Sequence, residues 1–182
     1  MNREEALELF KNSEEIVSAT DVEASIRTMA ADIRNELGDA FPLLLSVMGG
    51  AAVFTGMLLP HLDFPLEFDY VHLTRYHNTT RGGDMHWRVA PGESVKDRTV
   101  LVIDDILDEG QTMAAIRDRI LAMGAKTFKS AVLCEKMIAQ SKPLRPDFCG
   151  FTVPDRYVFG CGMDVKGYWR NLPAIRALTV PR

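Results

Sequence analysis

The sequence predicts a single α/β domain in which a mostly parallel sheet is covered by helices. After Gly38, short apolar runs bounded by Gly, Pro or charged residues alternate with helical segments. The chain has 182 residues, of which 47% are hydrophobic, so it is long enough to close one core without disulfides or a structural metal. In sheets of this kind the ligand site lies at the carboxyl ends of the strands.

The first forty residues are predicted to be helical. Thr20-Asp21-Val22-Glu23 has the pattern of a capping box, in which the first and last side chains satisfy free backbone N–H groups. The apolar residues that follow at helical spacing, up to Gly38, are Val22, Ile26, Met29, Ile33 and Leu37. We expect this stripe to be a core-facing surface.

In the rest of the domain, about residues 41–175, predicted strands alternate with predicted helices. Its predicted strands are Leu43 to Met48, Leu66 to Leu73, Thr99 to Ile103, Ser130 to Cys134 and Phe148 to Val153. Its predicted helices are Ala51 to Leu59 and Gln111 to Met123.

Residues 76–98 do not fit the alternation. A polar segment leads to a possible edge strand around Trp87 to Val89 and then to the turn Pro91-Gly92. A long polar segment inside a compact domain is typical of a mobile lid or of a disordered insert.

Charge and targeting signals exclude several classes of partner. The net charge is −4, from 21 basic and 25 acidic residues, so there is no basic footprint for nucleic acid or an anionic membrane. The first residues are acidic, unlike a signal peptide, and no apolar run approaches the roughly 18 residues that a membrane span needs. We expect a cytoplasmic protein that binds neither nucleic acid nor membrane.

The cysteines point to the same compartment. Cys134, Cys149 and Cys161 are odd in number and share no metal-binding spacing. We expect all three to be reduced residues of the core.

Two carboxylates follow the apolar run Val100 to Ile103. Adjacent strand residues point to opposite faces, so Asp104 and Asp105 are expected to need separate partners and not to form a simple pair. A loop with Gly110 then leads to Thr112 at the start of a helix, where backbone N–H groups and the helix dipole favour an anion.

The combination of an acidic strand end and an anion-binding helix start limits the class of ligand that can bind. Carboxylates beside a phosphate site would repel the phosphate unless they faced sugar hydroxyls or a divalent cation. A phosphorylated sugar with a free diol, held partly through Mg²⁺, satisfies both requirements. A P-loop nucleotide site is excluded because no matching glycine-rich motif occurs upstream. The acidic pair of a receiver domain is also a poor match, because that pair would come nearer the N-terminus. A merely solvated acidic turn would leave the loop and helix unexplained.

The segment from Val100 to Thr112 resembles the phosphoribosyl pyrophosphate motif of type I phosphoribosyltransferases, and the surrounding residues resemble their hypoxanthine-guanine branch. The similarity runs from about Leu43 to Ala177. It implies a type I phosphoribosyltransferase fold with a small hood and a mobile lid, here residues 76–98. It also implies Mg²⁺ as cofactor, with phosphoribosyl pyrophosphate and a 6-oxopurine as substrates.

The resemblance assigns roles around the acidic strand end. Asp104 and Asp105 would engage the ribose diol, one of them through Mg²⁺, although the family usually has Glu at the first position. Asp108 would be the catalytic carboxylate that faces the purine N7. The residues expected to wrap the 5′-phosphate are Glu109, Gly110, Gln111 and Thr112.

Further along the chain, the resemblance identifies the purine site. Lys136 would donate to the exocyclic oxygen of the base, Tyr157 would stack on the ring, and Val158 would contact the ring edge through its backbone. Asp164 matches a second Mg²⁺ ligand beside the purine site, and Arg170 matches a pyrophosphate contact.

The pyrophosphate loop departs from the family pattern. Gly49-Gly50 stands where the family usually has a basic residue followed by Gly, in a loop that can hold a non-proline cis peptide. Arg75-Tyr76 replaces the usual Ser-Tyr at the base of the lid, and Arg75 is a candidate to supply the missing positive charge.

The resemblance predicts transfer of the phosphoribosyl group to hypoxanthine or guanine, with release of pyrophosphate. Two alternatives stay open: an enzyme for xanthine or another base, and a phosphoribosyl pyrophosphate sensor that binds nucleic acid. The family also implies a homodimer or homotetramer, for which residues 51–59 are a candidate contact.

Overall fold

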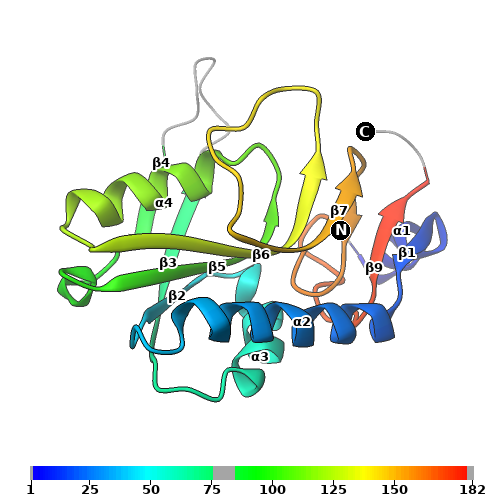
Figure 1. The fold of residues 1–182 in the computed structure, drawn as a ribbon. Helices are drawn as coiled ribbons and strands as arrows, with labels where there is room; N and C mark the ends of the chain where they lie inside the picture. Colours follow the sequence, from blue (N-terminus) through cyan, green and yellow to red (C-terminus); the bar gives the residue numbers. More distant parts are fainter. Residues whose placement is uncertain (1, 76–84, 180–182) are drawn as a thin grey trace.

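A six-stranded sheet forms the centre of the protein in a computed structural model that describes residues 2–75 and 85–179 (Figure 1). In sheet order its strands are β4 (Met85–Val89), β3 (Glu67–Arg75), β2 (Leu43–Val47), β5 (Thr99–Leu107), β6 (Thr127–Met137) and β7 (Phe148–Pro154). Every neighbouring pair is parallel except β3 and β4. The predicted mostly parallel α/β sheet is confirmed.

Helices cover both faces of this sheet. Figure 1 shows α4 (Gln111–Ala122) on one face and α2 (Ala19–Leu37) with α3 (Ala51–Leu58) on the other. Side chains of β5 alternate between the two cores: Leu101 and Ile103 belong to the cluster with α2 and α3, and Val100 and Val102 to the cluster with α4. In the part of the chain that the structure describes, no helix is long and apolar enough to cross a membrane.

A second, three-stranded antiparallel sheet lies beside the first and corresponds to the hood that the resemblance implies. It consists of β1 (Ser13–Val17), β9 (Ile175–Leu178) and β8 (Val158–Phe159), and α1 (Arg3–Lys11) precedes it. The prediction that the first forty residues are all helical is wrong at β1. This strand exists because it pairs with β9, more than 150 residues away, and local patterning carries no signal of such a partner.

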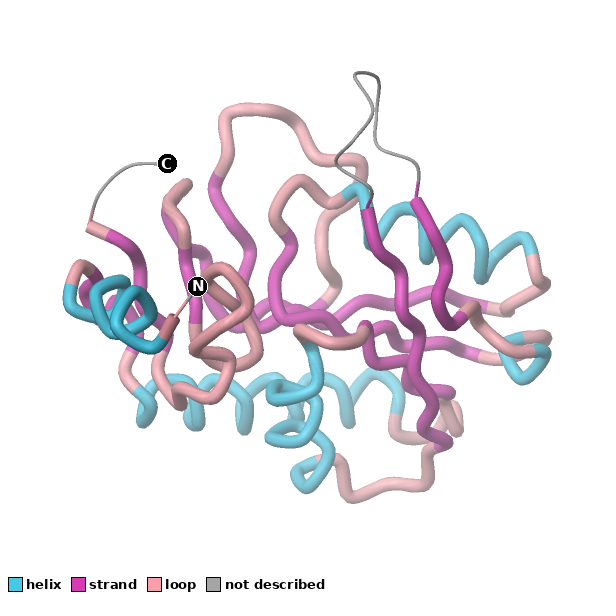
Figure 2. Tube along the Cα trace, turned by 180° about the vertical axis from the view of Figure 1, so that it is seen from behind, coloured by secondary structure: helices cyan, strands magenta, loops and turns pink. Residues whose placement is uncertain are grey.

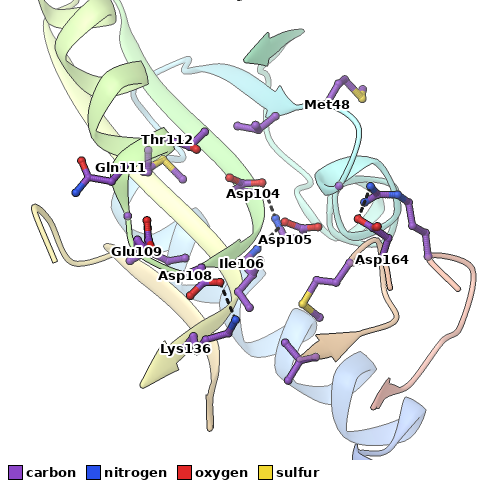
Figure 3. Close-up of a pocket in the computed structure, with 18 of the residues that line it drawn as sticks. Met48, Asp104, Asp105, Ile106, Asp108, Glu109, Gln111, Thr112, Lys136 and Asp164 are labelled. Carbon is purple, nitrogen blue, oxygen red and sulfur yellow. Dashed lines mark hydrogen bonds and ion pairs between the residues drawn. The ribbon is translucent and has the colours of Figure 1, made fainter. Parts of the chain in front are cut away.

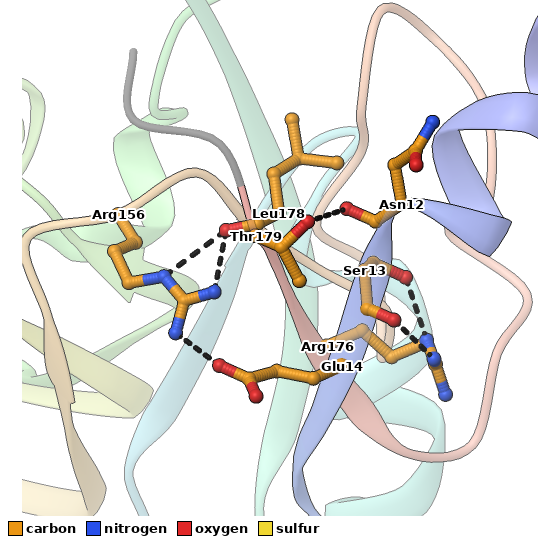
Figure 4. A network of polar contacts seen from close by, with 7 residues as sticks. All are labelled: Asn12, Ser13, Glu14, Arg156, Arg176, Leu178 and Thr179. Carbon is orange, nitrogen blue, oxygen red and sulfur yellow. Dashed lines mark hydrogen bonds and ion pairs between the residues drawn. The ribbon is translucent and has the colours of Figure 1, made fainter.

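Polar contacts fasten this second sheet (Figure 4). Arg156 donates from Nε to the carbonyl of Leu178 at 3.0 Å and forms an ion pair with Glu14 of β1. Arg176 donates to the carbonyl of Ser13 at 2.8 Å. Because Arg156 directly precedes Tyr157, the same contacts fix the segment that carries the predicted purine-binding residues.

The start of α2 differs from the prediction. Ser18 caps the helix, with its hydroxyl accepting from the backbone N–H of Asp21 at 3.1 Å, so the capping box expected at Thr20 lies inside the first turn. Ser18 has the extended backbone that an N-cap requires, whereas Thr20 is already helical. The predicted end at Gly38 is confirmed.

The segment predicted as a lid divides into two parts. Residues 76–84 lie outside the described residues. Residues 85–98 are not a lid: they hold β4, which confirms the edge strand, and a short 3-10 helix, η2 (Glu93–Val95), in which Val95 is fully buried. Figure 2 shows β3 and β4 side by side at the sheet edge. Partial burial of alternate β4 side chains, including Trp87, stabilises this strand.

Two of the three cysteines are core residues, as predicted. Cys134 and Cys161 are buried, but Cys149 is exposed, because β7 is an edge strand and Cys149 points away from the core. All three are free thiols.

Packing between α3 and the sheet should contribute measurably to the free energy of unfolding. Phe54 of α3 is fully buried, so Phe54→Ala should lower the free energy of unfolding by about 3–5 kcal/mol in urea titrations. Phe68→Ala, at an aromatic residue that is 45% exposed, should change it by less than about 0.5 kcal/mol. Equal losses in the two variants would contradict the packing described here.

Candidate active site

A pocket of about 510 Å³ opens at the carboxyl ends of β2, β5 and β6 (Figure 3). It brings together residues from six separate stretches of the sequence. The predicted site residues that line it are Gly50, Asp104, Asp105, Asp108, Glu109, Gly110, Gln111, Thr112, Lys136, Tyr157, Val158, Asp164 and Arg170.

Three predicted pyrophosphate residues are not among those lining residues. Gly49 lies beside the pocket, and its peptide bond with Met48 is cis, a form that the resemblance allows for this loop. Arg75 is the last residue of β3, but its side chain and all of Tyr76 lie outside the described part of the chain. The idea that Arg75 replaces the missing basic side chain therefore stays a prediction.

The acidic pair stands where β5 continues beyond its neighbour. The last paired residues of β2 and β5 are Ser46 and Ile103, so Asp104 and Asp105 have β6 on one side and the pocket on the other. Asp104 Oδ1 accepts from the backbone N–H of Asp105 at 3.0 Å, and Asp105 Oδ1 accepts from that of Ile106 at 2.8 Å. These bonds fix the orientation of both carboxyl groups.

Burial and the proximity of the two carboxyl groups shift their pKa values. Burial raises the pKa of Asp104 well above its usual value, and the neighbouring Asp105 carboxylate raises it further. Burial also raises the pKa of Asp105, which a hydrogen bond from Asp104 opposes. Both carboxyl groups line the pocket, and each accepts from a different backbone N–H group. The expectation that the two need separate partners stays a prediction.

Glycines let the loop after β2 approach this pair. A Cβ atom at Gly50 would lie 2.1 Å from Oδ2 of Asp105, so no other residue fits there without a shift. Gly162 has a φ of +105°, and its Cβ would lie 2.0 Å from the carbonyl oxygen of Gly50. A Cβ at Gly49, in contrast, would meet nothing within 4 Å, so crowding does not explain the absent basic residue.

Asp108 and Lys136 form an ion pair in the pocket. Lys136 Nζ lies 2.7 Å from Oδ2 of Asp108, and the lysine side chain is only 3% exposed (Figure 3). The register of the sheet produces this contact, because Leu107 of β5 pairs with Glu135 of β6 directly before the two charged residues. The pair places a buried cation and a carboxylate side by side, facing the same space.

The N-terminus of α4 completes this side of the pocket. Gly110 is the N-cap residue with a φ of +79°, and no side chain caps the helix. Free N–H groups of the first turn and the positive end of the helix dipole therefore remain available for an anion.

Asp164 and Arg170 form a second ion pair, at 2.6 Å, on the opposite side of the pocket (Figure 3). The other oxygen of Asp164 accepts from the backbone N–H of Gly167 at 2.6 Å, and Arg170 donates to the carbonyl of Gly162 at 2.5 Å. Arg170 also opposes the rise in the pKa of Asp105 that burial causes. A divalent cation at Asp164 would therefore compete with Arg170.

Sequence reasoning missed Lys142, in the loop between β6 and β7. Its buried ammonium group donates to two backbone carbonyls at the ends of β5 and β6. A lysine in a polar loop is normally solvated, so nothing in the local sequence indicates such contacts.

The raised pKa of Asp104 has a consequence for stability. The pKa of Asp104 is higher in the folded than in the unfolded state. Between these two pKa values the free energy of unfolding falls as pH rises, because the folded protein must then lose a proton that it holds more tightly. Asp104→Asn should therefore raise the melting temperature by a few degrees at pH 7, and the gain should vanish below about pH 4. Asp39→Asn, at an exposed carboxyl group, is the control. A lower melting temperature for Asp104→Asn at pH 7 would contradict the assigned shift.

Comparison with known proteins identifies the family of this chain. Residues 12–166 match the family described as phosphoribosyl transferase domain. The chain is 32% identical to the hypoxanthine-guanine phosphoribosyltransferase of Bacillus subtilis over 164 residues, covering 90% of this chain and 91% of that one. It is 35% identical to the hypoxanthine-guanine-xanthine phosphoribosyltransferase of Tritrichomonas foetus, covering 87% of each chain.

Solved structures give the same result. A hypoxanthine phosphoribosyltransferase from Staphylococcus aureus is similar in fold, with a TM-score of 0.86 at 23% identity over 98% of this chain and 96% of that one. A hypoxanthine-guanine-xanthine phosphoribosyltransferase structure has a TM-score of 0.76 at 31% identity, covering 91% of this chain and 93% of that one. The chain belongs to the type I phosphoribosyltransferase family, in its hypoxanthine-guanine branch.

Proposed function

We propose that this protein acts in purine salvage and transfers the 5-phosphoribosyl group from phosphoribosyl pyrophosphate to hypoxanthine or guanine, giving IMP or GMP and pyrophosphate. The observation that carries this proposal is the buried Lys136–Asp108 ion pair, which lies beside an uncapped helix N-terminus and an acidic strand end in one pocket. These features offer groups for a 6-oxopurine, a phosphate and a sugar diol in that order.

The 5′-phosphate binds to the loop Glu109 to Thr112. Backbone N–H groups at the start of α4 donate to its oxygens, and the Thr112 hydroxyl adds a further donor. Gly110 makes this possible because its left-handed backbone turns the chain into the helix without a side chain over the anion.

The ribose diol faces Asp104 and Asp105. This donor set fits Mg²⁺, which prefers oxygen ligands and completes its shell with substrate oxygens and water. A cation there also offsets the repulsion and desolvation that raise the pKa of both carboxyl groups. When bound, Mg²⁺ neutralises charge on the leaving pyrophosphate.

Asp164 is proposed as the second Mg²⁺ ligand, and Arg170 as a pyrophosphate contact together with Gly49, Gly50, Arg75 and Tyr76. Arg170 suits this role because its guanidinium group binds phosphate oxygens in pairs. Its ion pair with Asp164 keeps both groups oriented toward the pocket before substrate binds.

The purine lies against Tyr157, with its ring edge along the Val158 backbone. Lys136 donates to the exocyclic oxygen, and Asp108 accepts a proton at N7. Adenine presents an amino donor to the Lys136 ammonium, so one N–H donor of this buried cation finds no acceptor on the base, and adenine is rejected.

Transfer forms the bond between the purine N9 and C1 of the sugar. The C1–oxygen bond breaks, pyrophosphate leaves with its electron pair, and the purine loses a proton to Asp108. Positive charge develops on the sugar ring during the displacement, and the Asp104–Asp105 carboxylates stabilise it. Exclusion of water suppresses hydrolysis. The segment proposed for this task is reduced to residues 76–84, which lie outside the described residues.

Xanthine is a second candidate base, because one of the similar relatives is named as a hypoxanthine-guanine-xanthine enzyme. The proposal also includes a homodimer or homotetramer and a cytoplasmic location, which the three free thiols favour.

Nucleotide formation with hypoxanthine, guanine, xanthine and adenine tests the proposal. We expect turnover with hypoxanthine or guanine, little with adenine, and a loss in kcat of about 10²- to 10⁴-fold in Asp108→Asn. Tight binding of phosphoribosyl pyrophosphate without turnover of any base would refute the enzyme and favour the nucleic-acid-binding sensor, which a gel shift would detect.

Lys136→Met tests base recognition separately. Loss of one charged hydrogen bond should lower kcat/KM for hypoxanthine by about 10- to 150-fold and leave that for adenine almost unchanged. Lys126→Met, at an exposed lysine before β6, should match the wild type. A parallel loss for both bases would show that Lys136 does not read the exocyclic group.

A further inference from the structure

We infer that Lys142 is a positioning residue, which holds Asp108 and Lys136 at a fixed separation from behind the pocket. It stands in the loop of residues 138–147 that connects β6 to β7. For the roles of Asp108 and Lys136, this inference rests on the proposed function.

The ammonium group of Lys142 contacts the ends of two neighbouring strands. Nζ donates to the carbonyl oxygen of Lys136 at 2.5 Å and to that of Leu107 at 3.0 Å, and it lies 3.2 Å from Oε1 of Glu135. An ammonium group has three donors, and each has an acceptor here. The Lys142 side chain is 9% exposed, so these are partly desolvated contacts and not surface pairing.

The backbone carbonyls that Lys142 contacts belong to, or directly precede, the two charged residues of the proposed purine site. Leu107 immediately precedes Asp108, and Lys136 is itself the base-reading residue. The ladder between β5 and β6 ends at Leu107 and Glu135, so no further strand pairing fixes the distance between the two charged residues. The Lys142 ammonium bonds to the carbonyl oxygens of both strands at this end. It therefore joins β5 and β6 where no backbone hydrogen bond of the ladder does.

The same loop also packs on the phosphate-binding segment. A Cβ at Gly110 would lie 3.2 Å from Cδ of Pro143 and 3.6 Å from Cβ of Lys142, so the loop backs this glycine closely. Lys142 itself is not among the residues that line the pocket. It therefore acts through Asp108 and Lys136 and not by touching substrate.

Replacing Lys142 by Met keeps most of the length of the side chain and removes its donors. Two carbonyl oxygens and the Glu135 carboxylate then lose a charged partner, which favours separation of the strand ends toward water. The matched controls are Lys126→Met, an exposed lysine, and Glu135→Gln, which weakens one of the three contacts and leaves both carbonyl bonds.

The first readout is amide hydrogen exchange in the ligand-free proteins. Residues 105–112 and 135–138 should exchange at least about tenfold faster in Lys142→Met, with little change in Lys126→Met and an intermediate effect in Glu135→Gln. Unchanged exchange in these segments would overturn the inference. If Lys142→Met does not fold, Lys142→Gln, which can still donate to one carbonyl, replaces it with the same criterion.

The second readout separates positioning from general destabilisation. The KM for hypoxanthine should rise about tenfold in Lys142→Met, and that for phosphoribosyl pyrophosphate by a smaller factor. Lys142 bonds directly to the strand ends that carry Asp108 and Lys136, whereas its loop only packs against Gly110 of the phosphate-binding segment. Equal rises in both KM values, or no rise, would overturn the inference with the proposed function intact. A wild-type protein without turnover would refute the proposed function alone, and hydrogen exchange would still decide whether Lys142 holds the strand ends.

Discussion

The length of β5 relative to β2 is the constraint on which the rest of the site depends. Because β2 pairs with β5 only as far as Ile103, the next residues of β5 enter a space that no strand fills. Two carboxylates occupy that space, and β6 supports them from the other side. Gly50 at the start of α3 and Gly162 from the C-terminal part then close around them, because only glycine tolerates these distances. The pocket is thus built from a mismatch in strand length.

This arrangement has an electrostatic cost. Asp104 and Asp105 are nearly buried beside one another, and desolvation raises the pKa of both. A chain selected for stability alone would place apolar side chains there. The same chain offsets other buried charges by pairing, as in Lys136 with Asp108. Two backbone N–H groups and Arg170 compensate the acidic pair only in part, because the pKa of both carboxyl groups stays raised. The site therefore gains most from a bound cation.

Local patterning predicts the five parallel strands of the central sheet because each is an apolar run, and it predicts β4 only as a possible edge strand in a polar segment. It places β2, β3 and β7 within two residues of their bounds, but it ends β5 and β6 too early, at Ile103 and Cys134. Those strands continue into charged residues, and only the neighbouring strand shows that the ladder goes on. The resemblance supplied most of the pocket residues, because its motifs mark strand ends that the parallel sheet brings to one edge.

The contacts that the sequence could not predict are those that join distant segments. Pairing between β1 and β9 and the bridge from Arg156 to Glu14 connect the two ends of the chain, and together they hold the segment with Tyr157 and Val158 beside the central sheet. Lys142 likewise acts only because a loop returns across two strand ends. In both cases a cationic side chain, Arg156 or Lys142, donates to backbone carbonyls at the end of a strand. Since any residue supplies a carbonyl, such a contact leaves no pattern in the sequence of its acceptor, and geometry alone reveals it.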